Sequence, residues 1–255
     1  MSSSNQPSQV RARITPRSVL VTGASGGIGR AITMACAAAG RHVGVHYHRS
    51  KVAAEELLQR VEGAGGRGTI HEADVRDACS VEHMVSAFAR NSPPPLAFVC
   101  AAGVGGGRLV LTLPEDEWAE VVTTNLTGLF HCLRAMGPPL RAQGGGSIVV
   151  IGSYAAYQGS AGQAAYAASK AGQLGLVKTA ALEWGIDNIC VNLIWPGWHN
   201  TALTAATGAR KTEWHDHALR RPPALDEVVR SVVHLTEVND VSGQVWNCDS
   251  RSVCL

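Results

Sequence analysis

A tyrosine and a lysine stand four positions apart in the stretch AAYAASKAGQ (164–173). On a helix, residues i and i+4 lie on one face, so the phenol of Tyr166 and the ammonium of Lys170 would point the same way. A phenol has a pKa of about 10, and a cation within about 4–6 Å lowers it by favouring the phenolate. The spacing is compatible with a catalytic pair, and equally with a helix whose small residues allow close packing.

Elements that must position such a pair are visible along almost the whole chain. Apolar runs predict strands at 18–23, 42–47, 68–75, 96–103, 147–153, 189–197 and 243–249. Helical patterns lie between them at 27–40, 51–66, 78–91, 114–136, 160–185 and 224–237. The strand runs are rich in Val, Ile and Leu without alternation, which is typical of a parallel sheet covered by helices on both faces. The sequence therefore predicts an α/β fold, a single-domain Rossmann-type doubly wound parallel sheet of about seven strands.

Two segments depart from this alternation. Residues 1–16 are mostly polar and predict a flexible N-terminal tail, so that the folded domain spans 17–255. Residues 198–223 are rich in Thr, His and Arg and contain two prolines. They predict an insertion over the edge of the sheet that acts as a lid on the substrate side.

Glycines follow the first strand run in TGASGGIGRA (22–31), with Gly23, Gly27 and Gly29 in the spacing G-x-x-x-G-x-G. Between a strand and a helix, such glycines let main-chain N–H groups approach a pyrophosphate. The second strand run ends in HYHRS without the acid that would bind the ribose of NAD. Arg49, preceded by His48, can instead pair with a 2′-phosphate, so NADPH (NADP+) is predicted as cofactor and NADH is less favoured.

Four of the strand runs end at unusual residues: Gly23, the sequence CAAG (100–103), Ser153, and Pro196 with Gly197. Ligands of open α/β sheets bind outside the carboxyl ends of the strands. These four signals therefore predict one crevice, and Tyr166 lies on the helix that follows the fifth run.

Several motifs together resemble the classical short-chain dehydrogenase/reductase family. The stretches TGASGGIG, ADV, AAG, NLTG, GS, YAASK and NLIWPGWHNT occur in the order and spacing of that family over residues 18–249. Within the family, the chain resembles the 3-oxoacyl-[acyl-carrier-protein] reductases and related polyketide ketoreductases.

The resemblance implies a catalytic role for four side chains. Tyr166 would give a proton to the carbonyl oxygen, and Lys170 would support it and hold the nicotinamide ribose. Ser153 would polarise the substrate oxygen, and Asn125 would position a water that connects the lysine to solvent. Asn is not a favoured residue inside a helix, so Asn125 is also consistent with a local kink.

The resemblance also implies cofactor contacts, with Asp74 at the adenine and with His199 and Thr201 at the carboxamide end. The predicted cofactor-binding residues are Gly23, Ser25, Gly26, Gly27, Ile28, Gly29, His48, Arg49, Asp74, Val75, Ala101, Gly103, Tyr166, Lys170, Pro196, Gly197, His199 and Thr201. The predicted substrate-binding residues are Ser153, Tyr154, Tyr157, Trp195 and Trp198, with Trp214 as a further aromatic candidate. Aromatic rings at these places suit an apolar slot for an extended chain.

The chain departs from the family pattern at four places. Gly26 replaces the arginine of TGASRGIG, which removes one potential 2′-phosphate contact and leaves more weight on Arg49. Cys100 and Ala101 replace the two asparagines of NNAG, which removes side-chain hydrogen bonds that brace the fourth strand. The stretch VGGG (104–107) replaces ITRD near the expected substrate mouth and hints at a bulkier or different acyl group. The end NCDSRSVCL replaces NVDGG, so subunit contacts or the pocket floor are expected to differ.

These features predict an NADPH-dependent ketoreductase that reduces the 3-keto group of an acyl thioester to a 3-hydroxyacyl product. The substrate would be of fatty-acid or polyketide type, bound to an acyl carrier protein that Arg108, Arg134 or Arg141 would steer. One alternative is a dehydrogenase acting on a small, sugar, steroid or cyclic alcohol or ketone. Another is a catalytically idle partner subunit. The resemblance further implies a cytoplasmic homo-oligomer, a tetramer or dimer.

Composition argues against several other classes of protein. The net charge of +2 is too small to indicate nucleic acid or an anionic membrane as partner, and no run approaches the ~20 apolar residues of a membrane span. The seven cysteines lie mostly in apolar runs and indicate buried thiols in a reducing compartment. The histidines are scattered, with His215 and His217 the nearest to a ligand pair, so no metal site is predicted.

Overall fold

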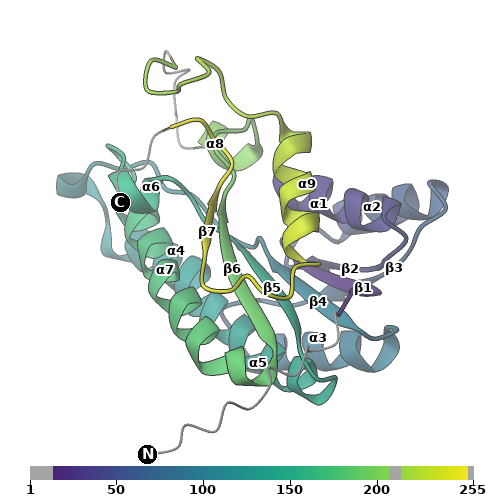
Figure 1. Cartoon of the computed structure of the whole chain (residues 1–255). Coiled ribbons are helices and arrows are strands. Elements are labelled where there is room, and N and C mark those ends of the chain that lie inside the picture. Colours follow the sequence, from purple (N-terminus) through teal and green to yellow (C-terminus); the bar gives the residue numbers. More distant parts are fainter. Residues whose placement is uncertain (1–13, 207–213, 252–255) are drawn as a thin grey trace, which may run out of the picture.

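The computed structural model describes residues 14–206 and 214–251 (Figure 1). Its centre is a seven-stranded sheet in the order β3-β2-β1-β4-β5-β6-β7, in which all neighbouring strands are parallel. The strands are β1 (Ser18–Thr22), β2 (His42–Tyr47), β3 (Arg67–Glu72), β4 (Leu96–Cys100), β5 (Gly146–Ile151), β6 (Ile189–Trp195) and β7 (Val245–Asn247). The order reverses between β1 and β4, which is where ligands bind in doubly wound sheets. The predicted fold class is confirmed.

Helices cover both faces of this sheet (Figure 1). One face packs against α1 (Gly27–Ala38), α2 (Lys51–Gly63) and α9 (Leu225–Leu235). The other packs against α3 (Ala78–Asn91), α5 (Gly128–Ala142) and α7 (Ala164–Trp184). The central strands therefore have no solvated face, and every residue of β1, β4 and β6 is buried. This is the physical reason for their uninterrupted apolar sequences.

The helix predicted over 114–136 is three consecutive helical segments. Its first part is α4 (Glu115–Val122), and a π-helical turn (Thr123–Thr127) joins α4 to α5. The last segment, α5, continues six residues past the predicted end, to Ala142, and contains Pro138 and Pro139. A proline removes one N–H donor but its φ is compatible with a helix, so the two prolines leave only the carbonyls of the preceding turn without their usual partners.

The two remaining differences concern shorter segments. The helix predicted over 160–185 begins at Ala164, and a separate short helix, α6 (Ala155–Gln158), precedes it. The predicted lid contains α8 (Ala202–Ala206), which lies at the same end of the sheet as α6 (Figure 1). Residues 207–213 of that segment lie outside the described residues, as do residues 1–13 of the predicted tail.

The described end of the predicted tail is attached to the folded chain. The N–H of Ile14 donates to Oδ1 of Asn239 at 2.8 Å, and Pro16 is buried. Turns complete the architecture at Val110–Thr112 and Gly185–Asp187. None of the helices in the described ranges combines the length and the apolar character that a bilayer span requires.

Candidate active site

A cleft of about 640 Å³ opens at the carboxyl ends of the strands, next to the switch point between β1 and β4. All the predicted cofactor-binding residues line it: Gly23, Ser25, Gly26, Gly27, Ile28, Gly29, His48, Arg49, Asp74, Val75, Ala101, Gly103, Tyr166, Lys170, Pro196, Gly197, His199 and Thr201. Ser153 lines it too, whereas Asn125 lies behind its wall. The fold thus brings together residues that are more than 170 positions apart in sequence, from Gly23 to Thr201.

The glycine loop leaves no room for side chains. A Cβ on Gly23, whose φ is +65°, would lie 2.8 Å from the main chain of Ala102, and a Cβ on Gly29 would lie 2.2 Å from the carbonyl oxygen of Gly23. The bare loop lets the N-terminus of α1 border the cleft, where N–H groups and the helix dipole favour a negative charge. The residues present therefore fit the phosphates of a dinucleotide.

His46 braces this loop and was missed by the sequence analysis. Its Nδ1 accepts a hydrogen bond from the N–H of Gly23 at 2.9 Å, so its Nε2–H donates to the carbonyl of Ala73 at 3.0 Å. Acceptance at Nδ1 requires the neutral imidazole, and burial lowers the pKa of His46 to about 4. Its position near the end of the second strand run, in HYHRS, was the available signal.

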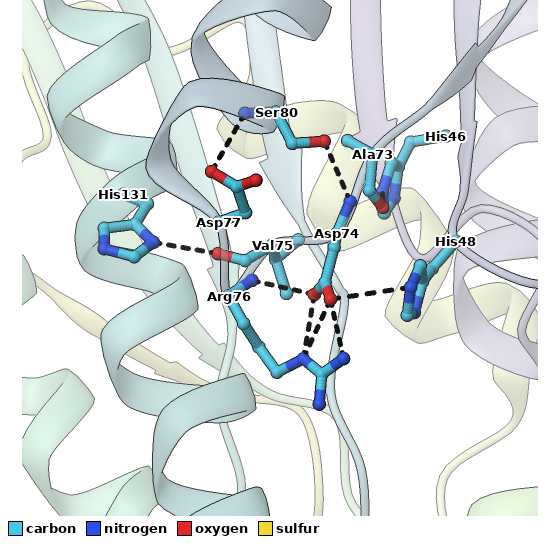
Figure 2. A network of polar contacts seen from close by, with 9 residues as sticks. All are labelled: His46, His48, Ala73, Asp74, Val75, Arg76, Asp77, Ser80 and His131. Carbon is cyan, nitrogen blue, oxygen red and sulfur yellow. Dashed lines mark hydrogen bonds and ion pairs between the residues drawn. The ribbon is translucent and has the colours of Figure 1, made fainter.

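Asp74 is the centre of a polar network at the end of β3 (Figure 2). Its carboxylate accepts from Nε and Nη2 of Arg76 at 2.9 and 2.6 Å, and Nε2 of His48 lies 3.5 Å from Oδ2. The Arg76 hydrogen bonds lower the pKa of Asp74 to about 2. Arg76 also lines the cleft and was not among the predicted residues. Arg49 is exposed at the cleft, on the same side as this network.

Ser153 and Tyr166 form a hydroxyl pair in the cleft, joined by a hydrogen bond. Burial raises the pKa of Tyr166, and the Ser153 hydrogen bond opposes that rise. The spacing of the pair led us to expect that Lys170 lowers the pKa of Tyr166, but Lys170 is not among the causes that shift this pKa in the structure. The Nζ of Lys170 lies 5.8 Å from the centre of the Tyr166 ring and donates to the carbonyl of Ile151 at 2.7 Å, so its charge is directed at β5.

Asn125 occupies the π-helical turn and is 1% exposed. Its Oδ1 accepts from the N–H of Val104 at 2.8 Å, and its Nδ2 donates to the carbonyl of Val104 at 2.9 Å and to Oγ of Ser169 at 3.1 Å. The π-helical turn agrees with a local kink at Asn125, whereas its role in positioning a water stays a prediction. The amide fixes Val104, the first residue of VGGG, against α7.

The main-chain carbonyl of Asn125 is linked to Lys170 by the side chain of Gln173. Nε2 of Gln173 donates to that carbonyl at 2.7 Å, and Oε1 accepts from Nζ of Lys170 at 3.4 Å. Gln173 was missed as well. It lies three positions after Lys170 and seven after Tyr166, on the same helix face, and this spacing was the available signal.

The aromatic candidates for the substrate wall form clusters of their own. Tyr154, Tyr157 and Trp195 have ring centroids 5.7–6.0 Å apart, and the Arg251 guanidinium lies 3.8 Å from the centre of the Tyr154 ring. Trp198 and Trp214 form a second pair at 5.7 Å. These five aromatic residues do not line the cleft in the described part of the chain, and Ser153 alone of the predicted substrate residues does.

Main-chain N–H groups of the CAAG stretch (100–103) donate to a threonine side chain on β1. Oγ1 of Thr22 accepts from the N–H groups of Ala101 and Ala102 at 3.1 and 3.2 Å. The Cys100 side chain is buried, with its Sγ 3.8 Å from Sδ of Met136. The Thr22 hydroxyl on the neighbouring strand β1 thus holds the main chain of Ala101 and Ala102.

Three arginines outside the cleft form ion pairs on the surface. Arg108, Arg134 and Arg141, the candidates for docking a carrier protein, form ion pairs with Glu117, Glu82 and Asp187 at 3.3, 2.9 and 2.6 Å. Across residues 14–206 and 214–251, no three His, Cys, Asp or Glu side chains group closely enough to hold a metal ion.

Known proteins similar to this chain agree with its fold and its motifs. The model of a family described as short chain dehydrogenase matches residues 17–212. The 3-oxoacyl-[acyl-carrier-protein] reductase FabG of Staphylococcus epidermidis is 34% identical over 207 residues, 81% of this chain and 84% of that protein. The 3-oxoacyl-[acyl-carrier-protein] reductase of Synechocystis sp. is 31% identical over 94% of this chain and 98% of that protein. A dehydrogenase/reductase structure from Sinorhizobium meliloti 1021 superposes with a TM-score of 0.83 at 26% identity, covering 92% of this chain and 94% of that one.

Proposed function

Because the chain belongs to the short-chain dehydrogenase family and is an oxidoreductase, we propose that it is an NADPH-dependent ketoreductase. Its substrate is an acyl thioester with a 3-keto group, and its product is the 3-hydroxyacyl thioester. The observation that carries this proposal is the Ser153–Tyr166 hydroxyl pair in the same cleft as the bare glycine loop. The names of the relatives from Staphylococcus epidermidis and Synechocystis support the choice of substrate class.

The side chains of the cleft divide the chemistry between them. When bound, the nicotinamide supplies the hydride. Ser153 and Tyr166 donate hydrogen bonds to the substrate oxygen, and Tyr166 transfers its proton there as the carbonyl becomes an alcohol. The high pKa of the buried phenol keeps Tyr166 protonated and ready to donate. Lys170 holds its ammonium 5.8 Å from the centre of the Tyr166 ring, where it donates to the carbonyl of Ile151.

The preference for NADPH rests on the end of β2. Arg49 is exposed at the cleft, and no Asp or Glu is present in HYHRS. A guanidinium binds a phosphate with two parallel hydrogen bonds, whereas an acid would repel it. Arg76 also lines the cleft, where its guanidinium is paired with the Asp74 carboxylate.

The remaining parts of the proposal concern partners and assembly. We propose that an acyl carrier protein presents the thioester in the cytoplasm, and that α8 (Ala202–Ala206) of the predicted lid, whose Leu203 and Thr204 line the cleft, closes over the substrate. The chain is proposed to form a tetramer or dimer. Exposed apolar side chains on α5 and α7 support this, with Phe130 45% and Leu182 86% exposed.

One assay separates the candidate functions. NADPH absorbance is followed with an acetoacetyl thioester, and then with simple cyclic and sugar ketones. Oxidation of NADPH with the thioester is the expected result. Oxidation with the simple ketones alone indicates a dehydrogenase of small alcohols, and no oxidation with any carbonyl indicates a partner subunit without catalysis.

A further inference from the structure

Gln173 occupies a position where its amide contacts both the charged group of the site and the distorted helix behind it. The side chain is buried, with 2% of the residue exposed, in the middle of α7. Its oxygen accepts from Nζ of Lys170 at 3.4 Å, and its nitrogen donates to the carbonyl of Asn125 at 2.7 Å. The π-helical turn (Thr123–Thr127) supplies that carbonyl at the point where the regular helix is interrupted.

The contacts of Lys170 show why such a partner matters. Its ammonium is buried, and burial lowers the pKa of Lys170 to about 8. Two oxygens among the described residues receive its hydrogen bonds, the carbonyl of Ile151 on β5 and Oε1 of Gln173 on α7. A buried cation without such acceptors loses its proton more easily, because only the charged form gains from them.

Other ionisable groups near Lys170 do not replace this support. The Tyr166 phenol on α7 has a pKa raised by burial. The Cys100 thiol lies on β4, and a hydrogen bond with Cys132 of α5 and burial raise its pKa well above the ordinary value. Both groups are therefore neutral near pH 8, while β5 and the π-helical turn contribute only the carbonyl of Ile151 and the amide groups of Asn125.

We propose that Gln173 is a positioning residue of this site: its Nε2 is anchored on the Asn125 carbonyl, and its Oε1 accepts from the ammonium of Lys170 and keeps it charged beneath Tyr166. The carboxamide of Gln173 accepts through its oxygen and donates through its nitrogen. It therefore orients the lysine but does not pass a proton on. The effect of Gln173 on catalysis rests on the proposed function. The effect of Gln173 on Lys170 does not.

The first test measures the titration of Lys170 directly. The chain has only four lysines, so 13Cε-lysine labelling gives a spectrum in which Lys170 is assigned with Lys170→Arg. Gln173→Met keeps the length of the side chain but removes both amide contacts, and the Lys170 midpoint is expected to fall by about one pH unit. Gln173→Glu places a carboxylate beside the ammonium and is expected to raise the midpoint.

A structural control and a kinetic readout complete the experiment. Val177→Ala opens the packing of α7 one turn further on and is expected to lower the melting temperature without moving the Lys170 midpoint. In the reductase assay, the pH at which kcat/KM falls on the alkaline side is expected to be lower than in the wild type for Gln173→Met and higher for Gln173→Glu.

Unchanged Lys170 midpoints in both Gln173 variants, or shifts of the same sign in both, would overturn the proposal even if the enzyme is an active reductase. Conversely, a wild-type chain that reduces no carbonyl overturns the proposed function, while the NMR titration still decides the role of Gln173.

Discussion

The N–H of Gly23 donates to Nδ1 of His46 at 2.9 Å, which ties the glycine loop to the end of β2. The same ring donates to the carbonyl of Ala73 after β3. One neutral imidazole thus fixes three neighbouring strand ends around the cleft. Protonation of Nδ1 would remove the acceptor on which this arrangement depends.

His46 is expected to make the protein sensitive to acid. Its pKa is about 4 in the folded chain against 6.5 ordinarily, so the unfolded state takes up a proton first as the pH falls. The contribution of neutral His46 to the unfolding free energy is complete above about pH 6.5 and is lost as the pH falls towards 4. About 2 kcal/mol of this free energy is lost at pH 5. The unfolding free energy, measured by urea denaturation, should therefore fall less between pH 7.5 and pH 5 in His46→Gln than in the wild type. His83→Gln, on the exposed side of α3, is the matched control. An equal pH dependence in wild type and His46→Gln would contradict the prediction.

Tyr166→Phe tests the proton donor. The phenylalanine keeps the ring but has no hydroxyl to donate, so kcat should fall by about 10²- to 10⁴-fold. NADPH affinity, measured by fluorescence titration, should change little because the ring remains in place. Retention of most of the turnover would exclude Tyr166 as the donor.

Arg49→Asp tests the cofactor preference. The substitution replaces a phosphate-binding cation by an anion, so the ratio of kcat/KM for NADPH to that for NADH should fall by about ten- to hundredfold. Arg67→Asp makes the same change of charge at the first residue of β3, the opposite end of that strand from Asp74, and should leave the ratio unchanged. A constant ratio in Arg49→Asp would assign the preference to other residues.

Gly103→Ala tests the contact between the CAAG loop and Asn125. A Cβ at Gly103 would lie 3.1 Å from Oδ1 of Asn125 and 3.9 Å from Nζ of Lys170, so the amide must move. We expect kcat/KM to fall about tenfold or more, since small displacements at a reacting centre are costly. Gly106→Ala serves as control, because its Cβ makes only an ordinary 3.6 Å contact with Val121. Equal activities of the two variants would show that Asn125 tolerates displacement.

Local sequence patterns carried much information about this protein. Uninterrupted apolar runs specified buried parallel strands, because a strand covered on both faces has no polar side. The glycine spacing specified a close approach of main chain to a ligand, since a Cβ at Gly29 would lie 2.2 Å from the carbonyl oxygen of Gly23. The i, i+4 spacing of Tyr166 and Lys170 placed them on one helix face before any tertiary contact was known.

Contacts between distant segments were decided only by the tertiary structure. His46 pairs with Gly23, Arg76 binds the Asp74 that was assigned to adenine, and Gln173 joins Lys170 to the carbonyl of Asn125. The pKa of Tyr166 was misjudged for the same reason. Spacing along a helix gives the direction of a lysine side chain, whereas burial and the carbonyl of Ile151 determine where its charge acts. Periodicity is a local property that sequence encodes directly, but the hydrogen-bond partners of a buried group depend on the packing of the whole chain.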